Sequence, residues 1–265
     1  MCNFETLASP ARGNSLFLTL YRLQFSLPGQ SWKLDTDATE HVVDIFSGTC
    51  RIKGSSSINE HFDFHPVGSR ENIFSGPPEL VYLPRRTSYS ISCRQGPCEL
   101  VIYSAPTDEN SKPVMVSGEA INCIDAGTSN WSRRVYIGFG EDSPATRIMV
   151  GETHSPPGNW SSFPPHRHQM NRPPEELALE ELYYFKFDRR QGFAIGGVYE
   201  DPLFPQVTSE LKIIGDGEIF DVPGGYHFIA PAPGYRLSYS WALGGEQKGF
   251  GKWVDDPNHE WLAKL

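Results

Sequence analysis

The sequence of 265 residues has no long apolar run and no excess of basic residues. No apolar segment approaches the ~20 residues that a membrane-spanning helix requires, so we expect no membrane partner. Lys and Arg number 23 against 32 Asp and Glu, which gives a formal charge of −9. A nucleic-acid-binding surface needs the opposite sign. We therefore expect neither nucleic acid nor a membrane as a partner, and an anionic substrate would need a locally positive pocket.

Signals for export, disulfide bonding and dinucleotide binding are also missing. Residues 1–12 lack a basic start followed by an apolar core, so no secretory leader is expected. The five cysteines are an odd number without a Cys-x-x-Cys pair, which is typical of reduced, buried thiols in a cytoplasmic protein. No glycine-rich dinucleotide fingerprint is present. We expect a cytoplasmic protein.

Long helical periodicity is scarce, whereas turn formers are abundant, with 25 Gly and 22 Pro. Short runs of β-branched and aromatic residues recur between the turns, for example at 41–46, 99–103, 182–187 and 235–241. This pattern predicts an all-β sandwich or barrel. Residues 174–182 favour either one helical turn or a strand entered from a loop. The dipeptides at 47–48 and 216–217 predict hairpins.

A weak duplication divides the chain. The segment Val81-Tyr-Leu-Pro84-Arg-Arg-Thr-Ser-Tyr is similar to Asp221-Val-Pro223-Gly-Gly-Tyr-His227, because in each a hydrophobic strand leads into a proline turn. A polar stretch at 126–132 separates the halves. We therefore predict two similar β-barrels, with domain boundaries at 1–125 and 126–265.

The residues suited to chemistry are concentrated in the second half. In an extended strand alternate side chains share a face, so His166 and His168 are expected to point the same way. His227 begins a later strand, and Glu181 opens a strand between them. Three imidazoles and one carboxylate could hold a divalent ion whose open positions polarise a hydroxyl or carbonyl group.

Ordinary interpretations of the same residues remain open. His-x-His pairs occur on solvated strands without any metal. Glu181 could belong to an exposed acidic patch with Glu175, Glu176 and Glu180, and His227 could be a turn histidine.

The combined order of these residues resembles the signature of a cupin barrel. The second half is similar to the 5-deoxy-glucuronate isomerase family, bicupins related to the 5-keto-4-deoxyuronate isomerases. The motifs that carry the resemblance are Gly158-Asn-Trp-Ser-Ser-Phe-Pro-Pro-His166-Arg-His168, Glu180-Glu181-Leu-Tyr-Tyr-Phe, Gly192-Phe-Ala-Ile and Val222-Pro223-Gly-Gly-Tyr-His227. They span residues 133–261, and the resemblance of the first 120 residues is weaker.

This resemblance implies an all-β bicupin built from two jelly-roll cupin barrels. It also implies one divalent metal ion, with zinc as our first choice and manganese or iron as alternatives. The family's metal ligands correspond to His166, His168, Glu181 and His227. The first half has no histidine at the turn after Pro84, so we expect its barrel to be a degenerate scaffold.

The implied reaction is the aldose–ketose conversion of 5-deoxy-D-glucuronate to 5-dehydro-2-deoxy-D-gluconate in myo-inositol catabolism, through an enediol. The catalytic base is left open among Glu175, Glu176, Tyr183 and a metal-bound water. Bidentate arginine suits the substrate carboxylate, and the substrate-binding candidates are Arg134, Arg147 and Arg172.

Alternatives to this function are a 5-keto-4-deoxyuronate isomerase, an iron dioxygenase or a non-catalytic sugar-binding bicupin. A homo-oligomer is left open.

Overall fold

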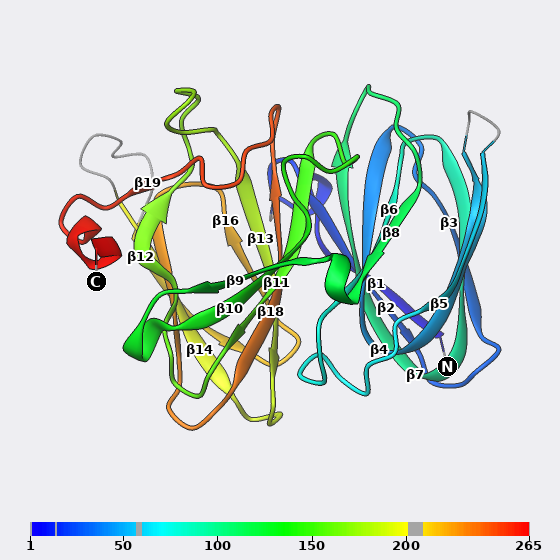
Figure 1. Ribbon diagram of the computed structural model, residues 1–265, viewed down its shortest axis with the longest axis horizontal. Helices are drawn as coiled ribbons and strands as arrows, with labels where there is room; N and C mark the ends of the chain where they lie inside the picture. Colours follow the sequence, from blue (N-terminus) through cyan, green and yellow to red (C-terminus); the bar gives the residue numbers. More distant parts are fainter. Residues whose placement is uncertain (1, 14, 57–59, 201–208, 265) are drawn as a thin grey trace. The chain divides into compact units, whose positions relative to one another are not determined.

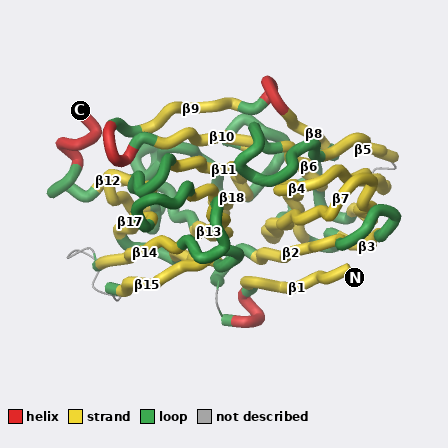
Figure 2. Tube along the Cα trace, turned by 90° about the horizontal axis from the view of Figure 1, so that it is seen from below, coloured by secondary structure: helices red, strands yellow, loops and turns green. Residues whose placement is uncertain are grey.

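The computed structural model of the chain describes residues 2–13, 15–56, 60–200 and 209–264. Strands dominate this part of the chain (Figure 1), and its helical segments are short 3-10 turns (Figure 2). The predicted all-β class is therefore confirmed. No helix within the described ranges is long and apolar enough to cross a bilayer.

The chain divides into two compact units. The first unit holds the residues up to Asn122 together with Tyr136–Gly151, and the second holds Cys123–Val135 together with the residues from Glu152 onward. The units are thus not contiguous in sequence. The predicted boundaries at 1–125 and 126–265 stay a prediction.

In the first unit, one sheet runs in the order β1-β2-β7-β4-β6-β8, with β3 paired to β7 and β5 paired to β4. These strands are β1 (Cys2–Ala8), β2 (Thr19–Phe25), β3 (Ser31–Asp35), β4 (Thr39–Ser56), β5 (His61–Val67), β6 (Glu79–Leu83), β7 (Thr87–Pro106) and β8 (Val114–Ser117). The 3-10 turns η1 (Pro10–Arg12) and η2 (Gly118–Ala120) lie in the same unit.

The long strands β4 and β7 organise the first unit. They pair from Thr39↔Pro106 to Ser56↔Thr87, so each runs the length of the sheet. The hairpin predicted at residues 47–48 is wrong, because β4 continues through them with shifts in its register. Gly48 adopts φ +77°, and a Cβ atom there would lie 2.6 Å from the Cys98 sulfur. The glycine therefore accommodates a bulge in a continuous strand rather than a chain reversal.

In the second unit, one sheet has the order β15-β14-β17-β12-β19 and another has the order β16-β13-β18-β11-β10-β9. The strands are β9 (Asn122–Ala126), β10 (Arg133–Phe139), β11 (Ile148–Ser155), β12 (Ser161–Arg167), β13 (Glu180–Phe187), β14 (Phe193–Tyr199), β15 (Glu210–Gly215), β16 (Ile219–Val222), β17 (Tyr226–Pro231), β18 (Leu237–Gly244) and β19 (Val254–Asp255). The chain passes between the two units within β10 and within β11. The 3-10 turns are η3 (Ser129–Trp131) and η4 (Glu260–Lys264).

Two local predictions for the second unit have different outcomes. Residues 174–179 form a loop that leads into β13 at Glu180, which is the strand alternative of the prediction. The turn at Asp216 and Gly217 is present, but it does not close a hairpin. Strand β15 pairs with β14 and β16 pairs with β13, so this turn carries the chain from one sheet to the other.

The carboxylate of Glu40 holds the segment Tyr136–Gly151, the second stretch of chain in the first unit. The side chain is fully buried, and Oε1 accepts hydrogen bonds from the amides of Arg147, at 2.6 Å, and Ile148, at 3.0 Å. Its Oε2 atom accepts from the amide and hydroxyl of Thr146, both at 2.8 Å, and from the Tyr82 hydroxyl at 2.9 Å. One buried carboxylate thus satisfies donors that have left water.

We expect Glu40→Gln to destabilise the first unit by about 2–4 kcal/mol, because the amide cannot accept the full donor set and leaves buried N–H groups unpaired. Urea unfolding followed by tryptophan fluorescence measures the change. The matched substitution Glu5→Gln removes an exposed ion pair with Arg22 and should cost less than about 1 kcal/mol. Equal effects of the two substitutions would contradict this account of Glu40.

Candidate metal centre

Strand β12 and the residue after it supply two histidines. His166 is the penultimate residue of β12, and His168 follows the end of the strand. Both side chains line one pocket, as strand alternation predicts for residues two apart. Their ring centroids are 6.1 Å apart.

A tight turn brings the third histidine to the same place. Gly225 adopts φ +86°, which a glycine adopts without strain. Its amide donates a 2.5 Å hydrogen bond to the side-chain oxygen of Gln169. His227 follows on β17, where it is the register partner of His166 on β12. Glu181, the second residue of β13, completes the group.

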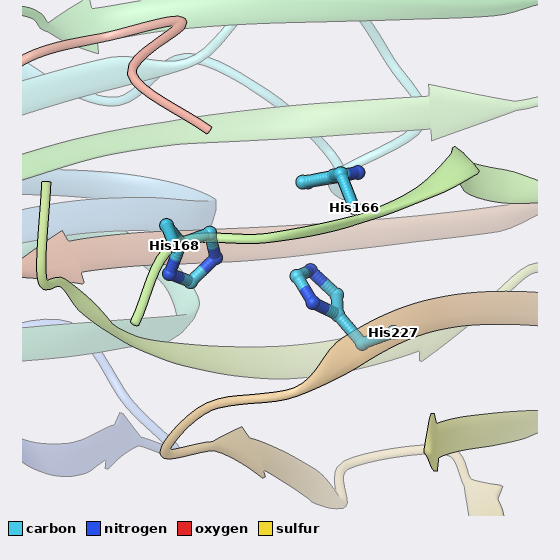
Figure 3. Close-up of side chains that lie close together, drawn as sticks. All are labelled: His166, His168 and His227. Carbon is cyan, nitrogen blue, oxygen red and sulfur yellow. The ribbon is translucent and has the colours of Figure 1, made fainter. Parts of the chain in front are cut away.

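The three histidines form a compact cluster (Figure 3), in which one ring nitrogen from each lies within 4.8 Å of the others. The His227 ring centroid is 4.5 Å from that of His166 and 5.1 Å from that of His168. Glu181 Oε2 lies 3.0 Å from His168 Nε2 and 3.3 Å from His227 Nε2. In the described part of the chain, no second group of histidine, cysteine or acidic residues is this compact.

Backbone carbonyl groups orient all three rings. The Nδ1 atoms of His166 and His168 lie 3.0 Å from the Pro164 carbonyl and 2.7 Å from the Leu179 carbonyl, respectively. His227 Nδ1 lies 3.4 Å from the carbonyl of Gly225. When Nδ1 carries the hydrogen and donates it to a carbonyl group, Nε2 keeps a free lone pair. Metal-binding histidines in proteins are commonly oriented in this way.

The environment of the cluster shifts its acid–base equilibria. Burial, together with the neighbouring imidazoles, lowers the pKa of His166 well below its usual value. Burial also acts to lower the pKa of His168, but the hydrogen bond and charge of Glu181 outweigh it and raise that pKa. Burial opposes ionisation of Glu181, yet the hydrogen bond with His168 and the charges of His168 and His227 lower its pKa. The carboxylate is therefore charged at neutral pH.

The cluster carries the features of a metal site. His227 is fully buried, and its Nε2 atom has no hydrogen-bond partner among the described residues. When the three imidazoles are neutral, as metal ligation requires, they and the carboxylate sum to one negative charge, and a divalent cation would leave a net positive charge. The cation would take the place of the proton that His168 shares with Glu181.

The pocket beside the cluster is lined by hydroxyl groups and apolar rings. Tyr183 donates to or accepts from Ser162 at 3.0 Å, and Tyr239 does the same with Ser161 at 2.6 Å. Burial, followed by the charge of Glu181, raises the pKa of Tyr183 well above its usual value, so this phenol stays protonated. The remaining lining residues include Leu243, Trp241, Phe250 and Trp253. Their apolar surface limits the access of water.

The structure brings only one of the three candidate bases, Tyr183, to this pocket. Glu175 is exposed in the loop before β13. Glu176 is buried outside the pocket. Its Oε1 atom accepts hydrogen bonds from Arg167 at 3.2 Å and from the Gln169 amide at 3.0 Å. Neither glutamate lines the pocket. The sequence pattern could not show that Glu176 has an arginine partner nine residues away.

None of the three candidate arginines is among the residues that line the pocket. Arg134 forms an exposed ion pair with Asp125, and Arg147 lies in the first unit, where it pairs with Asp108 at 2.9 Å. Arg172 is exposed in the loop after His168. The pocket instead holds Arg133, the neighbour of Arg134 on β10. Strand alternation was the available signal, since Arg133 and Val135 line the pocket together.

The described residues of the first unit form no equivalent cluster. Glu181 is paired across the sheet with Val222 on β16, the residue before a proline turn. In the first unit, His41 is paired in the same way with Leu83 on β6. His41 Nδ1 hydrogen-bonds with the Tyr89 hydroxyl at 2.8 Å, and burial lowers its pKa to about 4. A neutral, satisfied histidine thus occupies the position of the carboxylate.

The chain is similar to proteins of one known family. The sequence profile of the KduI/IolB family matches residues 11–262. A Geobacillus thermodenitrificans protein named 5-deoxy-glucuronate isomerase is 31% identical over 215 residues, which cover 80% of this chain and 77% of that protein. A Bacillus subtilis protein of the same name is 29% identical over 216 residues, which cover 80% and 78% of the two chains.

Solved structures extend the similarity to the whole fold. An IolB-like protein from Salmonella typhimurium matches with a TM-score of 0.88 at 25% identity, covering 97% of this chain and 94% of that one. A Bacillus subtilis oxalate decarboxylase matches with a TM-score of 0.69 at 13% identity, covering 99% and 76%, which supports the predicted bicupin fold alone. The family profile, the relatives and the shared fold agree, and this chain belongs to the KduI/IolB family.

Proposed function

We propose that this protein is a metal-dependent aldose–ketose isomerase that converts 5-deoxy-D-glucuronate to 5-dehydro-2-deoxy-D-gluconate in myo-inositol catabolism. The observation that carries the proposal is the cluster of three histidines beside a pocket, with Glu181 in contact with His168 and His227. The names of the relatives support the substrate and the reaction. A cytoplasmic location and a homo-oligomer stay predictions.

The metal ligands in this proposal are His166, His168, Glu181 and His227, with zinc as the ion and manganese or iron as alternatives. Their nitrogen and oxygen donors suit each of these ions. The bound ion would supply positive charge to the two oxygens of the substrate while negative charge develops on them. The orphaned Nε2 atom of His227 supports this assignment.

The conversion is a balanced internal transfer without any external oxidant. The C2–H bond breaks and a C1–H bond forms, so a proton leaves C2 and one arrives at C1. A second proton leaves the C2 hydroxyl and reaches the C1 oxygen. The substrate aldehyde carbon is reduced while C2 is oxidised, and the intermediate is an enediol.

In this reaction Tyr183 relays the proton between the two substrate oxygens. A hydroxyl group both donates and accepts hydrogen bonds, and that of Tyr183 is buried in the pocket beside Ser162. The aromatic side chains of Trp241 and Trp253 keep bulk water from the enediol. Glu175 and Glu176 remain candidates only if the loop between His168 and β13 rearranges.

Purified protein should contain about one divalent ion per chain, because the described residues hold one ligand cluster. His227→Ala should lower metal affinity by at least about 10²-fold while the protein stays folded. Elemental analysis and circular dichroism measure the two properties. His61→Ala, an exposed histidine on β5, is the matched control and should retain the metal. Full metal content in the His227 variant would refute the assigned ligands.

Incubation with 5-deoxy-D-glucuronate in deuterated water should yield the ketose, with deuterium at C1 when the transferred proton exchanges with solvent. Proton NMR follows the loss of the anomeric signal. Absence of turnover with a fully metal-loaded protein would contradict the proposed substrate. Turnover of 5-keto-4-deoxyuronate instead would reassign it, and consumption of oxygen would indicate a dioxygenase.

Tyr183→Phe should lower kcat by about 10²-fold with little change in KM, since it removes a proton relay but keeps the ring in place. Steady-state kinetics at constant metal content measure the effect. Tyr21→Phe, a half-buried tyrosine of the first unit, should leave the kinetics unchanged. An unchanged kcat in the Tyr183 variant would remove this residue from the mechanism.

A further inference from the structure

Arg133 is a sheltered cation in the pocket that holds the histidine cluster. It is the first residue of β10 and is half-buried. Its Nη1 atom donates a 3.1 Å hydrogen bond to the carbonyl of Trp131, which fixes one side of the guanidinium. Among the residues that line the pocket, Arg133 and Glu181 are the ones with permanently charged side chains.

Arg133 differs from other sheltered arginines in its lack of a counter-ion. Arg167 is paired with Glu176 at 3.2 Å, and Arg70 lies 3.9 Å from Asp44. Within the described ranges, by contrast, no carboxylate forms an ion pair with Arg133. Burial lowers the pKa of Arg133, and the nearby phenols of Tyr239 and Tyr183 oppose this shift. A half-buried guanidinium that lines a pocket and has no anionic partner can receive an anionic group of a ligand.

Ring contacts run from the histidine cluster to two tyrosines whose charge acts on Arg133. The ring of His227 lies 6.4 Å from that of Tyr183, and the rings of Tyr183 and Tyr239 are 5.2 Å apart. Both phenols lie close enough to Arg133 to affect its ionisation. The pocket is therefore lined by the histidine cluster, by the cationic side chain of Arg133 and by two tyrosines.

We propose that Arg133 binds the carboxylate of the sugar-acid substrate and makes the site selective for acids over neutral sugars. The fork of the guanidinium matches a carboxylate bidentately. With the acid group held there, the aldehyde end of the substrate is directed to the histidine cluster. This inference rests on the proposed function for its substrate but concerns a residue outside the proposed set of metal ligands.

The test compares Arg133→Gln and Arg133→Lys with Arg236→Gln, which removes an exposed ion pair in the same unit. The substrates are 5-deoxy-D-glucuronate and its neutral analogue 5-deoxy-D-glucose. Arg133→Gln should lower kcat/KM for the acid by about 10–100-fold, mainly through KM, and leave the neutral sugar unaffected. Arg133→Lys should recover part of the loss, because the charge returns without the fork. Arg236→Gln should match the parent protein.

Equal losses for the acid and the neutral sugar would indicate a structural role and overturn the inference. It would also be overturned if Arg134→Gln lost selectivity for the acid while Arg133→Gln kept it.

A binding measurement separates this inference from the proposed reaction. The fluorescence of Trp241 and Trp253, which line the pocket, should report the binding of D-glucuronate and of D-glucose. The parent protein should bind the acid at least about 10-fold more tightly, and Arg133→Gln should abolish that preference. This result would stand even if 5-deoxy-D-glucuronate were not turned over. A parent protein without the preference, or a variant that retains it, would refute the role of Arg133.

Discussion

The site depends on the contacts between three imidazole Nδ1 atoms and three backbone carbonyl groups. These contacts turn the Nε2 atoms of His166, His168 and His227 toward one another, and they come from Pro164, Leu179 and Gly225. The carbonyl groups belong to the strand β12, the loop before β13 and the turn before β17. The ligand geometry is therefore set by backbone positions, and each segment must be held in place for the cluster to form.

A connected polar network holds two of those segments. Arg167 and Glu176 are both buried, and the carboxylate also accepts the amides of Gln169 and Met170 at 3.0 and 3.2 Å. The side chain of Gln169 in turn accepts the amide of Gly225, at the turn that presents His227. Breaking a buried ion pair on one side leaves an uncompensated charge, so this network is more costly to disturb than a surface pair. Glu176 thus serves the site through its effect on backbone position.

The sequence predicted those features that depend on local patterns. Period-two alternation placed His166 and His168 on one face, and turn formers indicated an all-β chain. Glu181 and His227 were assigned by family resemblance, because residues far apart in sequence share no local signal. Arg134 was chosen although alternation favours Arg133, which shares a face of its strand with Val135 in the pocket. Gly48 was assigned to a turn, because a bulge within a strand and a hairpin use the same residue type.

The charge of the protein makes the local cations decisive. A chain of formal charge −9 repels an acidic sugar at long range, but at physiological ionic strength this repulsion is screened beyond about 8 Å. Selectivity must then come from charges inside the pocket, where water is scarce and interactions are stronger. The guanidinium of Arg133 would bind the carboxylate of a sugar acid, and a divalent ion at the histidine cluster would bind its aldehyde end. Such two-point binding would restrict the substrate to one orientation, with its aldehyde carbon at the histidine cluster. Restricting the orientation of a substrate in this way makes a large contribution to the rate.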